Sequence, residues 1–341
     1  MMEGPHIFGG SPVALCISAR IAVTSARRVS SAIAPVNPAT LISVGLVLLS
    51  VILKSYTNKR LPNNQLFASH DLSQRLERAE GMANASYIEA RARLSPGSGA
   101  EWIDVAGTYA MFDTPESPVT QTFGLGMFGP VAAADLDRIE AFFTERGAPV
   151  HHEISPLADP SVWPLITERR YIPFEFTSIL YLDLRGTAFP GPDRASGITV
   201  RPPTPDEQQL WAGIAAAGWG FPPDTESGLS SIFQTTFTAA GVVPFFAENG
   251  AENGSTPIGT GALNLQSGVA LLAGASTIPA ARNQGAQRAL LAARLQFAAE
   301  ARCDIATMGA QPGSTSQKNA ERAGFRIAYT RTKWKIDKTA V

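Results

Sequence analysis

Cysteine and histidine are scarce in this sequence of 341 residues, which has two cysteines and four histidines. Cys16 and Cys303 lie far apart, so there is no disulfide framework and no cysteine pair with metal-ligand spacing. His151 and His152 are the only adjacent histidines, and we interpret them as a pair at a strand edge rather than as ligands. A Gly-x-Ser-x-Gly nucleophile elbow is absent as well. We therefore predict neither a metal site nor Ser/His/Asp chemistry.

Acidic residues are missing from positions 4–70, where six of the 28 basic residues lie. The formal net charge of −1 for the whole chain therefore hides a charge of −6 on residues 71–341. The net negative charge of residues 71–341 disfavours binding to the phosphate backbone of a nucleic acid. We predict no nucleic-acid partner.

The first 65 residues admit three interpretations. Residues 41–53 are apolar, but prolines and an asparagine at 35–38 shorten the usable helix below the roughly 20 residues that span a bilayer. An acid-free start with arginine and serine is also typical of a transit peptide. We favour a poorly structured extension of a cytoplasmic protein, and keep a membrane anchor through 41–53 and organelle targeting as alternatives.

A strand of small residues, a short loop and a helix are predicted over residues 268–301. Residues 268–277 are uncharged and small or β-branched, and Gly274 permits a bulge. A helix that begins near Gly285 leaves its first backbone N–H groups without intrahelical partners, and its dipole attracts anions. Arg282 adds a positive charge beside them. The pattern predicts a loop that holds a phosphate.

Further elements surround this loop in a defined order. After it, the pattern predicts a strand over 303–310, a helix from the turn at 312–314 to Arg322, a helix-ending Gly324 and a strand over 326–336. Before it, the pattern predicts a strand over 197–201, a helix start at 203–207, a helix over 230–240 and a hairpin of strands 242–247 and 257–265.

This loop and this order resemble the GNAT superfamily of N-acyltransferases, whose acetyl-CoA loop reads Arg/Gln-x-x-Gly-x-Gly/Ala. Arg282 and Gly285 match it, whereas Gln287 stands where glycine or alanine is usual and Asn283 replaces a frequent glycine. The resemblance implies that acetyl-CoA or another acyl-CoA is the co-substrate, without a metal. It implies that the binding residues are Ala275, Ser276, Thr277, Arg282, Asn283, Gln284, Gly285, Ala286, Gln287, Arg288 and Ser316.

Residues 66–185 look like a second, eroded copy of the same unit. The copy would consist of strands over 120–128, 150–155 and 173–184 and helices over 132–146 and 162–169. Only Gly129-Pro130-Val131 separates its first strand from its helix, so we expect one acyl-CoA site per chain.

We therefore predict an α/β (α+β) architecture of two GNAT-like domains, each a mixed, mostly antiparallel sheet flanked by helices. The boundaries would be 1–65 for the extension, 66–190 for the degenerate domain and 195–338 for the acyl-CoA-binding domain. An unrelated α+β domain in the first half is the alternative.

The resemblance implies an N-acyltransferase in which a small-molecule or peptide amine attacks the thioester directly. Many relatives protonate the leaving thiolate with a tyrosine at the position of Ala320, so Tyr329 and Ser316 are the candidates for a catalytic role here. Glu226 and Glu248 are candidate bases, and a water chain is another. Trp219 is a candidate for the acceptor groove. The alternative function is a non-catalytic module that senses acyl-CoA or serves as a scaffold, and a chance match of the loop is a third interpretation.

Overall fold

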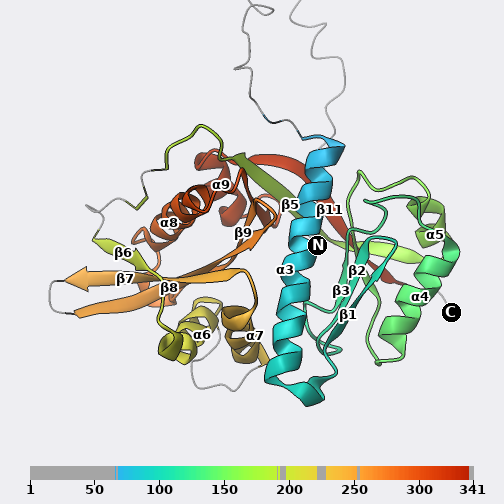
Figure 1. The fold of residues 1–341 in the computed structure, drawn as a ribbon, viewed down its shortest axis with the longest axis horizontal. Helices are drawn as coiled ribbons and strands as arrows, with labels where there is room; N and C mark the ends of the chain where they lie inside the picture. The colour runs from blue at the N-terminus through green and yellow to red at the C-terminus, as the bar shows by residue number, and fades with distance from the viewer. Residues whose placement is uncertain are drawn as a thin grey trace, which may run out of the picture. The chain divides into compact units, whose positions relative to one another are not determined.

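The computed structural model describes residues 66, 68–189, 191–192, 197–220, 228–251 and 254–337. The strands in this part of the chain form one sheet in the order β1-β2-β3-β4-β11-β5-β10-β9-β8-β7-β6 (Figure 1). Their bounds are β1 Glu101–Val105, β2 Thr108–Phe112, β3 Gln121–Phe123, β4 His151–Ile154, β5 Tyr171–Asp183, β6 Ile198–Arg201, β7 Val242–Ala251, β8 Gly254–Gln266, β9 Val269–Thr277, β10 Ile305–Ala310 and β11 Arg326–Ile336. The pairs β3–β4 and β9–β10 are parallel, and the other pairs are antiparallel.

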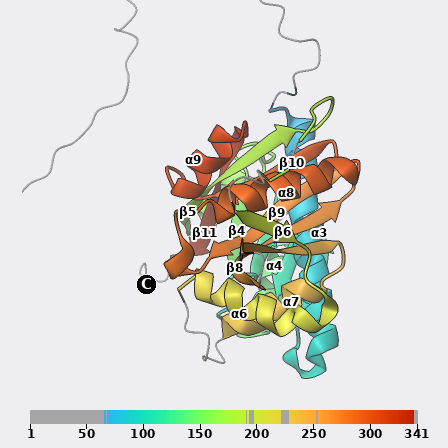
Figure 2. The ribbon, with the colours of Figure 1, turned by 90° about the vertical axis from the view of Figure 1, so that its left-hand side faces the viewer.

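Helices cover both faces of this sheet. Their bounds are α3 His70–Leu94, α4 Ala133–Thr144, α5 Val162–Glu168, α6 Gln208–Gly218, α7 Gly228–Thr238, α8 Ala286–Glu300 and α9 Thr315–Arg322, with single 3-10 turns at Pro96–Ser98, Pro205–Glu207 and Pro279–Ala281. Figure 2 shows α8 and α9 on one side of strands β6–β10 and α6 and α7 on the other. The side chains of β9 alternate between the two faces of the sheet. Ala270 and Leu272 pack into the core that includes α8, whereas Val269 packs with α3.

Each half of the chain completes its sheet with a strand from the other half. Strand β5 ends the first half, yet it lies between β10 and β11 of the second. Strand β11 ends the second half and lies between β4 and β5 of the first. Residues Leu66–Val341 therefore form one compact unit of two interlocked halves. The domain boundaries at 190 and 195 stay a prediction.

Helix α3 is the long element that the sequence analysis missed. Ser69 caps it by accepting a hydrogen bond from the Leu72 N–H (3.2 Å), and Asp71 in the first turn favours the positive end of the dipole. The helix buries large apolar side chains such as Leu76 and Ile88, but it also buries Ser73 and Glu77. Polar residues therefore interrupt the apolar face that would predict a buried helix. It packs against strands of both halves. The pair β1–β2 was missed as well.

Two local expectations for the first half are wrong. The strand expected over 120–128 ends at Phe123, because Gly124 and Gly126 adopt left-handed conformations (φ +77° and +71°) and turn the chain. His151 and His152 do not lie at a sheet edge, because β4 pairs with β3 on one side and β11 on the other.

A buried arginine connects α3 with two strands. Arg331 of β11 pairs with Glu77 and Glu80 of α3 and with Glu153 of β4. The Arg331 side chain is 2% exposed, and Glu77 is fully buried. The Tyr329 hydroxyl donates a hydrogen bond to Glu77 Oε1 at 2.7 Å. We call these five residues the Arg331 cluster.

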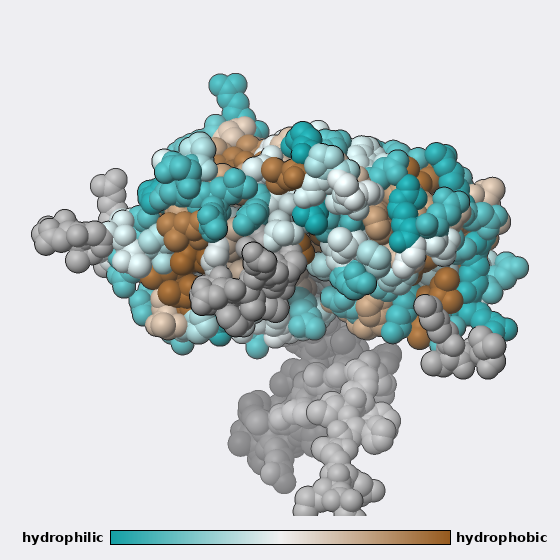
Figure 3. All heavy atoms as spheres, turned by 90° about the horizontal axis from the view of Figure 1, so that it is seen from below, coloured by the Kyte–Doolittle hydropathy of each residue, from teal (hydrophilic) through white to brown (hydrophobic). Residues whose placement is uncertain are grey.

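The described surface has no continuous apolar face in the view of Figure 3, where brown patches lie separated among teal and white residues. Scattered apolar side chains of this kind are ordinary on folded proteins. Among the described helices, none has the length and apolar character needed to cross a bilayer. The apolar stretch 41–53 lies outside the described residues.

Removing the cation from the Arg331 cluster tests its part in stability. Arg331→Met leaves three carboxyl groups without their partner, and we expect the free energy of unfolding to fall by about 3–5 kcal/mol. Urea unfolding of the full chain measures it. Arg185→Met is the control, since Arg185 and its partner Asp183 are partly exposed and such pairs contribute about 1 kcal/mol or less. A loss no larger for Arg331 than for Arg185 contradicts the assignment.

Candidate functional site

The N-terminus of α8 presents free backbone donors. Gly285 caps the helix with φ +94°, a conformation that favours glycine, and its carbonyl accepts the first intrahelical bond from the Ala289 N–H (3.0 Å). The N–H groups of residues 286–288 precede that bond and have no partner within the helix. The first turn contains no acidic residue, and Arg282 and Arg288 are exposed beside it. This helix end can bind an anion of the size of a phosphate.

Arg282 also ties this loop to its surroundings. Its Nη2 donates to the Gly218 carbonyl at the end of α6 (3.1 Å), and its Nε donates to the Thr277 carbonyl at the end of β9 (3.4 Å). The guanidinium therefore fixes the ends of a helix and a strand next to the loop, while its charge remains at the surface.

The two departures from the family pattern have structural explanations. Gln287 donates from Nε2 to Thr277 Oγ1 at 2.8 Å, so the side chain that replaces glycine or alanine joins the helix to the end of β9. Asn283 adopts a left-handed conformation with φ +65°. Asparagine tolerates this conformation better than most residues, which accounts for its place where the family often has glycine.

Strands β9 and β10 part beside the loop. Their parallel pairing covers Val269–Leu271 opposite Ile305–Thr307, and both strands continue beyond it. The register of β9 against β8 also shifts between Ser276 and Ala273, and Gly274 at this bulge has φ +60°. The bulge expected at Gly274 is therefore present. Beyond Leu271, the backbone N–H and C=O groups of β9 that face β10 are not paired with that strand. They can therefore form hydrogen bonds with the amide or carbonyl groups of a ligand.

The side chains of the strand end are already engaged. Ser276 Oγ donates to the Ala215 carbonyl of α6 at 3.1 Å, and Thr277 Oγ1 accepts from Gln287. Both residues are buried, and Ala275 is half-buried. A contribution of Ala275, Ser276 and Thr277 to binding would therefore come from their backbone groups.

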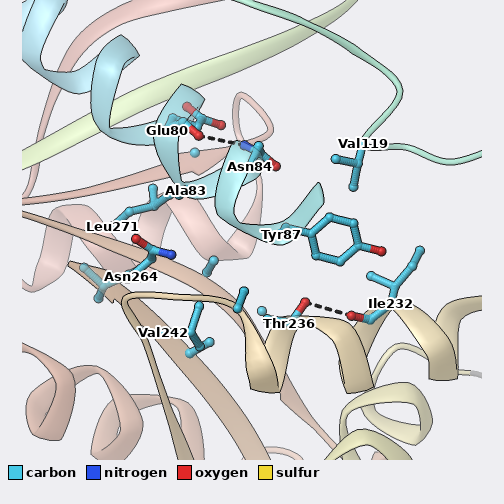
Figure 4. A pocket seen from close by; sticks show the side chains of 16 residues that line it. Glu80, Ala83, Asn84, Tyr87, Val119, Ile232, Thr236, Val242, Asn264 and Leu271 are labelled. Carbon is cyan, nitrogen blue, oxygen red and sulfur yellow. Dashed lines mark hydrogen bonds between the residues drawn. The ribbon is translucent and has the colours of Figure 1, made fainter. Parts of the chain in front are cut away.

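A cavity of about 350 Å³ lies where β9 and β10 part (Figure 4). Residues 271–274 of β9 and Gly309 of β10 line it, together with residues of α3, α7, β7 and β8. In Figure 4, Asn84 and Tyr87 of α3 lie across the cavity from Thr236 and Val242. The strand that leads to the candidate phosphate-binding loop thus also lines this half-open cavity.

A buried cation that no sequence pattern predicted lies under the same strands. Arg294 of α8 is 4% exposed, and its guanidinium donates to the carbonyls of Leu290, Ala262 and Ala273. Burial lowers the pKa of Arg294 to about 10, so the group stays charged at neutral pH. Its position on the buried face of an alanine- and leucine-rich helix concealed it.

Ser316 and Tyr329, the candidates for proton transfer, lie on different elements. Ser316 is exposed in the first turn of α9, and Ala320 is buried on the same helix. Tyr329 belongs to the Arg331 cluster, where burial and the neighbouring Glu77 raise the pKa of its hydroxyl well above the ordinary value. A catalytic role for Ser316 or Tyr329 stays a prediction.

The remaining residues considered in the sequence as bases, ligand contacts or metal ligands lie elsewhere in the structure. Glu248 is buried in β7 and pairs with Arg201 at 2.8 Å. Glu226 lies outside the described residues. Trp219 caps α6 and is 60% exposed, which makes it available to a ligand. His152 is buried against Thr122 Oγ1 (3.0 Å), and no cluster that could hold a metal occurs in the part of the chain that the structure describes.

Comparison with solved structures supports the GNAT fold. A GCN5-related N-acetyltransferase from Kribbella flavida matches with a TM-score of 0.53 and 17% identity, over 74% of this chain and 95% of that one. A tandem GNAT protein from the clavulanic acid biosynthesis pathway matches with a TM-score of 0.50 and 13% identity, over 79% and 96% of the two chains. No protein-family model and no curated protein sequence matches the chain. The chain therefore has the fold of the tandem GNAT proteins.

Substituting Gly285 tests the phosphate-binding loop. Gly285→Glu places a carboxylate and a strained left-handed residue at the helix end, and we expect the affinity for coenzyme A to fall by at least about 100-fold. Gly147→Glu is the matched control, because Gly147 also has positive φ and open space around its Cα but lies in the first half. Calorimetric titration of both variants measures the effect. Equal affinities of the two variants for coenzyme A refute this loop as the binding site.

His152 predicts a specific pH dependence of stability. Burial lowers its pKa to about 3, whereas histidine in an unfolded chain titrates near 6.5. Between these values the unfolded chain binds a proton that the folded chain does not. The free energy of unfolding should therefore fall by about 1.4 kcal/mol per unit as the pH drops from 6.5 toward 3. Other groups, such as the neighbouring His151 whose pKa is also lowered, titrate in both proteins, so the pH profile of urea unfolding should be steeper for wild type than for His152→Gln by this amount. Parallel pH profiles contradict it.

Proposed function

We propose that the chain is an acyl-CoA-dependent N-acyltransferase with one acyl-CoA site, formed by the end of β9 and the start of α8. The support is the coincidence of three features in a GNAT fold: a helix N-terminus without a side-chain cap and with arginines beside it, a neighbouring strand that parts from its partner, and a cavity at the point of parting. The second half of the chain holds all of the loop, whereas in the described part of the first half the segment between β3 and α4 contains no arginine.

Each part of the site has a role in this proposal. The N–H groups of residues 286–288 bind the pyrophosphate, with Arg282 and Arg288 beside it. The unpaired edge of β9 binds the amides of the pantetheine arm and the thioester oxygen, which becomes negative when the amine attacks. Arg294, charged and buried behind β9, favours that negative charge through the low-dielectric interior. Transfer forms a C–N bond and breaks the C–S bond, while the amine nitrogen loses one proton and the leaving thiolate takes one up.

Acetyl is the expected acyl group and an amine the expected acceptor. The second candidate function is a non-catalytic module that senses acyl-CoA. Ala320 favours it, because its buried methyl group cannot protonate the leaving thiolate. Both functions require acyl-CoA binding, and only the first requires transfer.

Titration of the full chain with acetyl-CoA, followed by a thiol-release assay with a panel of amines, tests the proposal. We expect saturable one-to-one binding in calorimetry and amine-dependent release of coenzyme A. Binding without release for every amine favours the sensing module. A well-folded sample that binds neither acetyl-CoA nor longer acyl-CoAs excludes both functions.

A further inference from the structure

Arg294 is an unusual residue for its place on α8. The other buried residues of this helix are alanine and leucine, and Arg294 itself is 4% exposed. Burial lowers the pKa of its guanidinium, and no carboxylate of the described residues offsets that effect. Apolar residues of similar volume often replace buried charged groups without loss of stability. Filling the core therefore does not explain why an arginine lies here.

The guanidinium of Arg294 lies at the bulge between β8 and β9. The register of the two strands shifts after the pair Ala262–Ala273, and Gly274 and Ala275 of β9 then lie opposite the single residue Gly261 of β8. An extra residue of this kind is left without its ladder partner, and it bends the strand. The bulge also lies beyond the last pair of β9 with β10, so the ladders on both sides of β9 are interrupted here.

Arg294 forms hydrogen bonds with both strands beside this bulge. Its Nη1 donates to the carbonyls of Ala262 (3.2 Å) and Ala273 (3.4 Å), which face each other across the two strands. Its Nε donates to the Leu290 carbonyl of its own helix at 3.2 Å. One planar, rigid group therefore joins α8, β8 and β9, and its geometry sets the distances between them.

Gly261 leaves the room that this guanidinium needs. A Cβ added at Gly261 would lie 3.3 Å from Cζ and Nε of Arg294 and 3.4 Å from its Nη1. The backbone of Gly261 does not require glycine, since it is not among the described glycines with positive φ. The close approach of the guanidinium therefore accounts for the glycine, and the two residues form one device at the bulge.

We propose that Arg294 is a positioning residue that fixes the bulge of β9 and thereby orients the backbone groups of Gly274 and Ala275 toward the thioester of bound acyl-CoA. The planar fork of the guanidinium does this, and a positive charge alone does not. The part that concerns the thioester rests on the proposed function. The part that concerns the bulge rests on the contacts of Arg294 and on the register of the strands.

Binding of acetyl-CoA, compared with binding of its isolated nucleotide part, tests the link to the thioester. The nucleotide part keeps the pyrophosphate and lacks the pantetheine arm, so in the proposed function it binds at the loop before α8 and not along β9. We expect Arg294→Lys and Arg294→Met each to weaken calorimetric binding of acetyl-CoA to the full chain by at least about tenfold, because misaligned backbone groups lose hydrogen bonds. The affinity for the nucleotide part should stay unchanged.

The choice of variants separates the fork from the charge. Lysine keeps the positive charge and lacks the planar fork, so wild-type affinity for acetyl-CoA in Arg294→Lys overturns the positioning role. An equal loss of affinity for acetyl-CoA and for the nucleotide part also overturns it, because that result indicates a general disturbance of the fold. Arg138→Met is the control, an exposed change on α4 of the first half that should alter neither affinity.

Amide hydrogen exchange tests the bulge without any ligand. We expect the amides of residues 273–276 to exchange at least about tenfold faster in Arg294→Lys than in wild type, and those of β2 to exchange equally in both. Gly261→Ala keeps every polar group and only crowds the guanidinium, so it is a milder second variant with a smaller increase at the same residues. Equal exchange of these residues in wild type and both variants overturns the proposal.

The two proposals fail in different ways. If the wild-type chain binds neither acetyl-CoA nor the nucleotide part, the proposed function is removed, and hydrogen exchange still decides whether Arg294 fixes the bulge. Binding of acetyl-CoA that neither Arg294 variant weakens removes the positioning role alone.

Discussion

The buried charge of Arg331 constrains how the two halves of the molecule come together. A guanidinium that is 2% exposed requires carboxylates around it, and these come from α3 and from β4, elements of the first half, while Arg331 itself lies near the end of the chain. The arginine can find these partners only when β11 lies beside β4 inside the first half's sheet. The strand exchange and the ion cluster therefore depend on one another, and α3 is held across both halves.

This arrangement explains how the first half of the chain contributes to the cavity beside β9. Glu77 and Glu80 are three residues apart on α3, so both lie on one helical face. Glu77 points to the interior and pairs with Tyr329, while Glu80 reaches both Arg331 and the cavity. The same turn of the helix thus anchors the fold and supplies polar surface to the space beside β9.

The second half could be predicted closely from the sequence because its signals are local. Nearby residues alone predict three boundaries: a strand that ends at Thr277, a helix that begins after Gly285 and a strand that begins after Gly324. The structure has a strand or helix boundary at each of these places. The proposed phosphate-binding loop could be located for the same reason. Helix α3 and the strand exchange could not, because the buried Ser73 and Glu77 interrupt the apolar pattern of α3, and pairing between distant strands leaves no local signal.

The cavity also lay beyond sequence reasoning, and its charge shows why. Glu80, Asn84 and Asn264 look like surface residues in the sequence, since glutamate and asparagine are seldom buried. Only the packing of α3 over the parting of β9 and β10 brings them to one space. A molecule in this cavity would therefore contact residues of both halves, which follows from the interlocking of the halves rather than from any motif of either one.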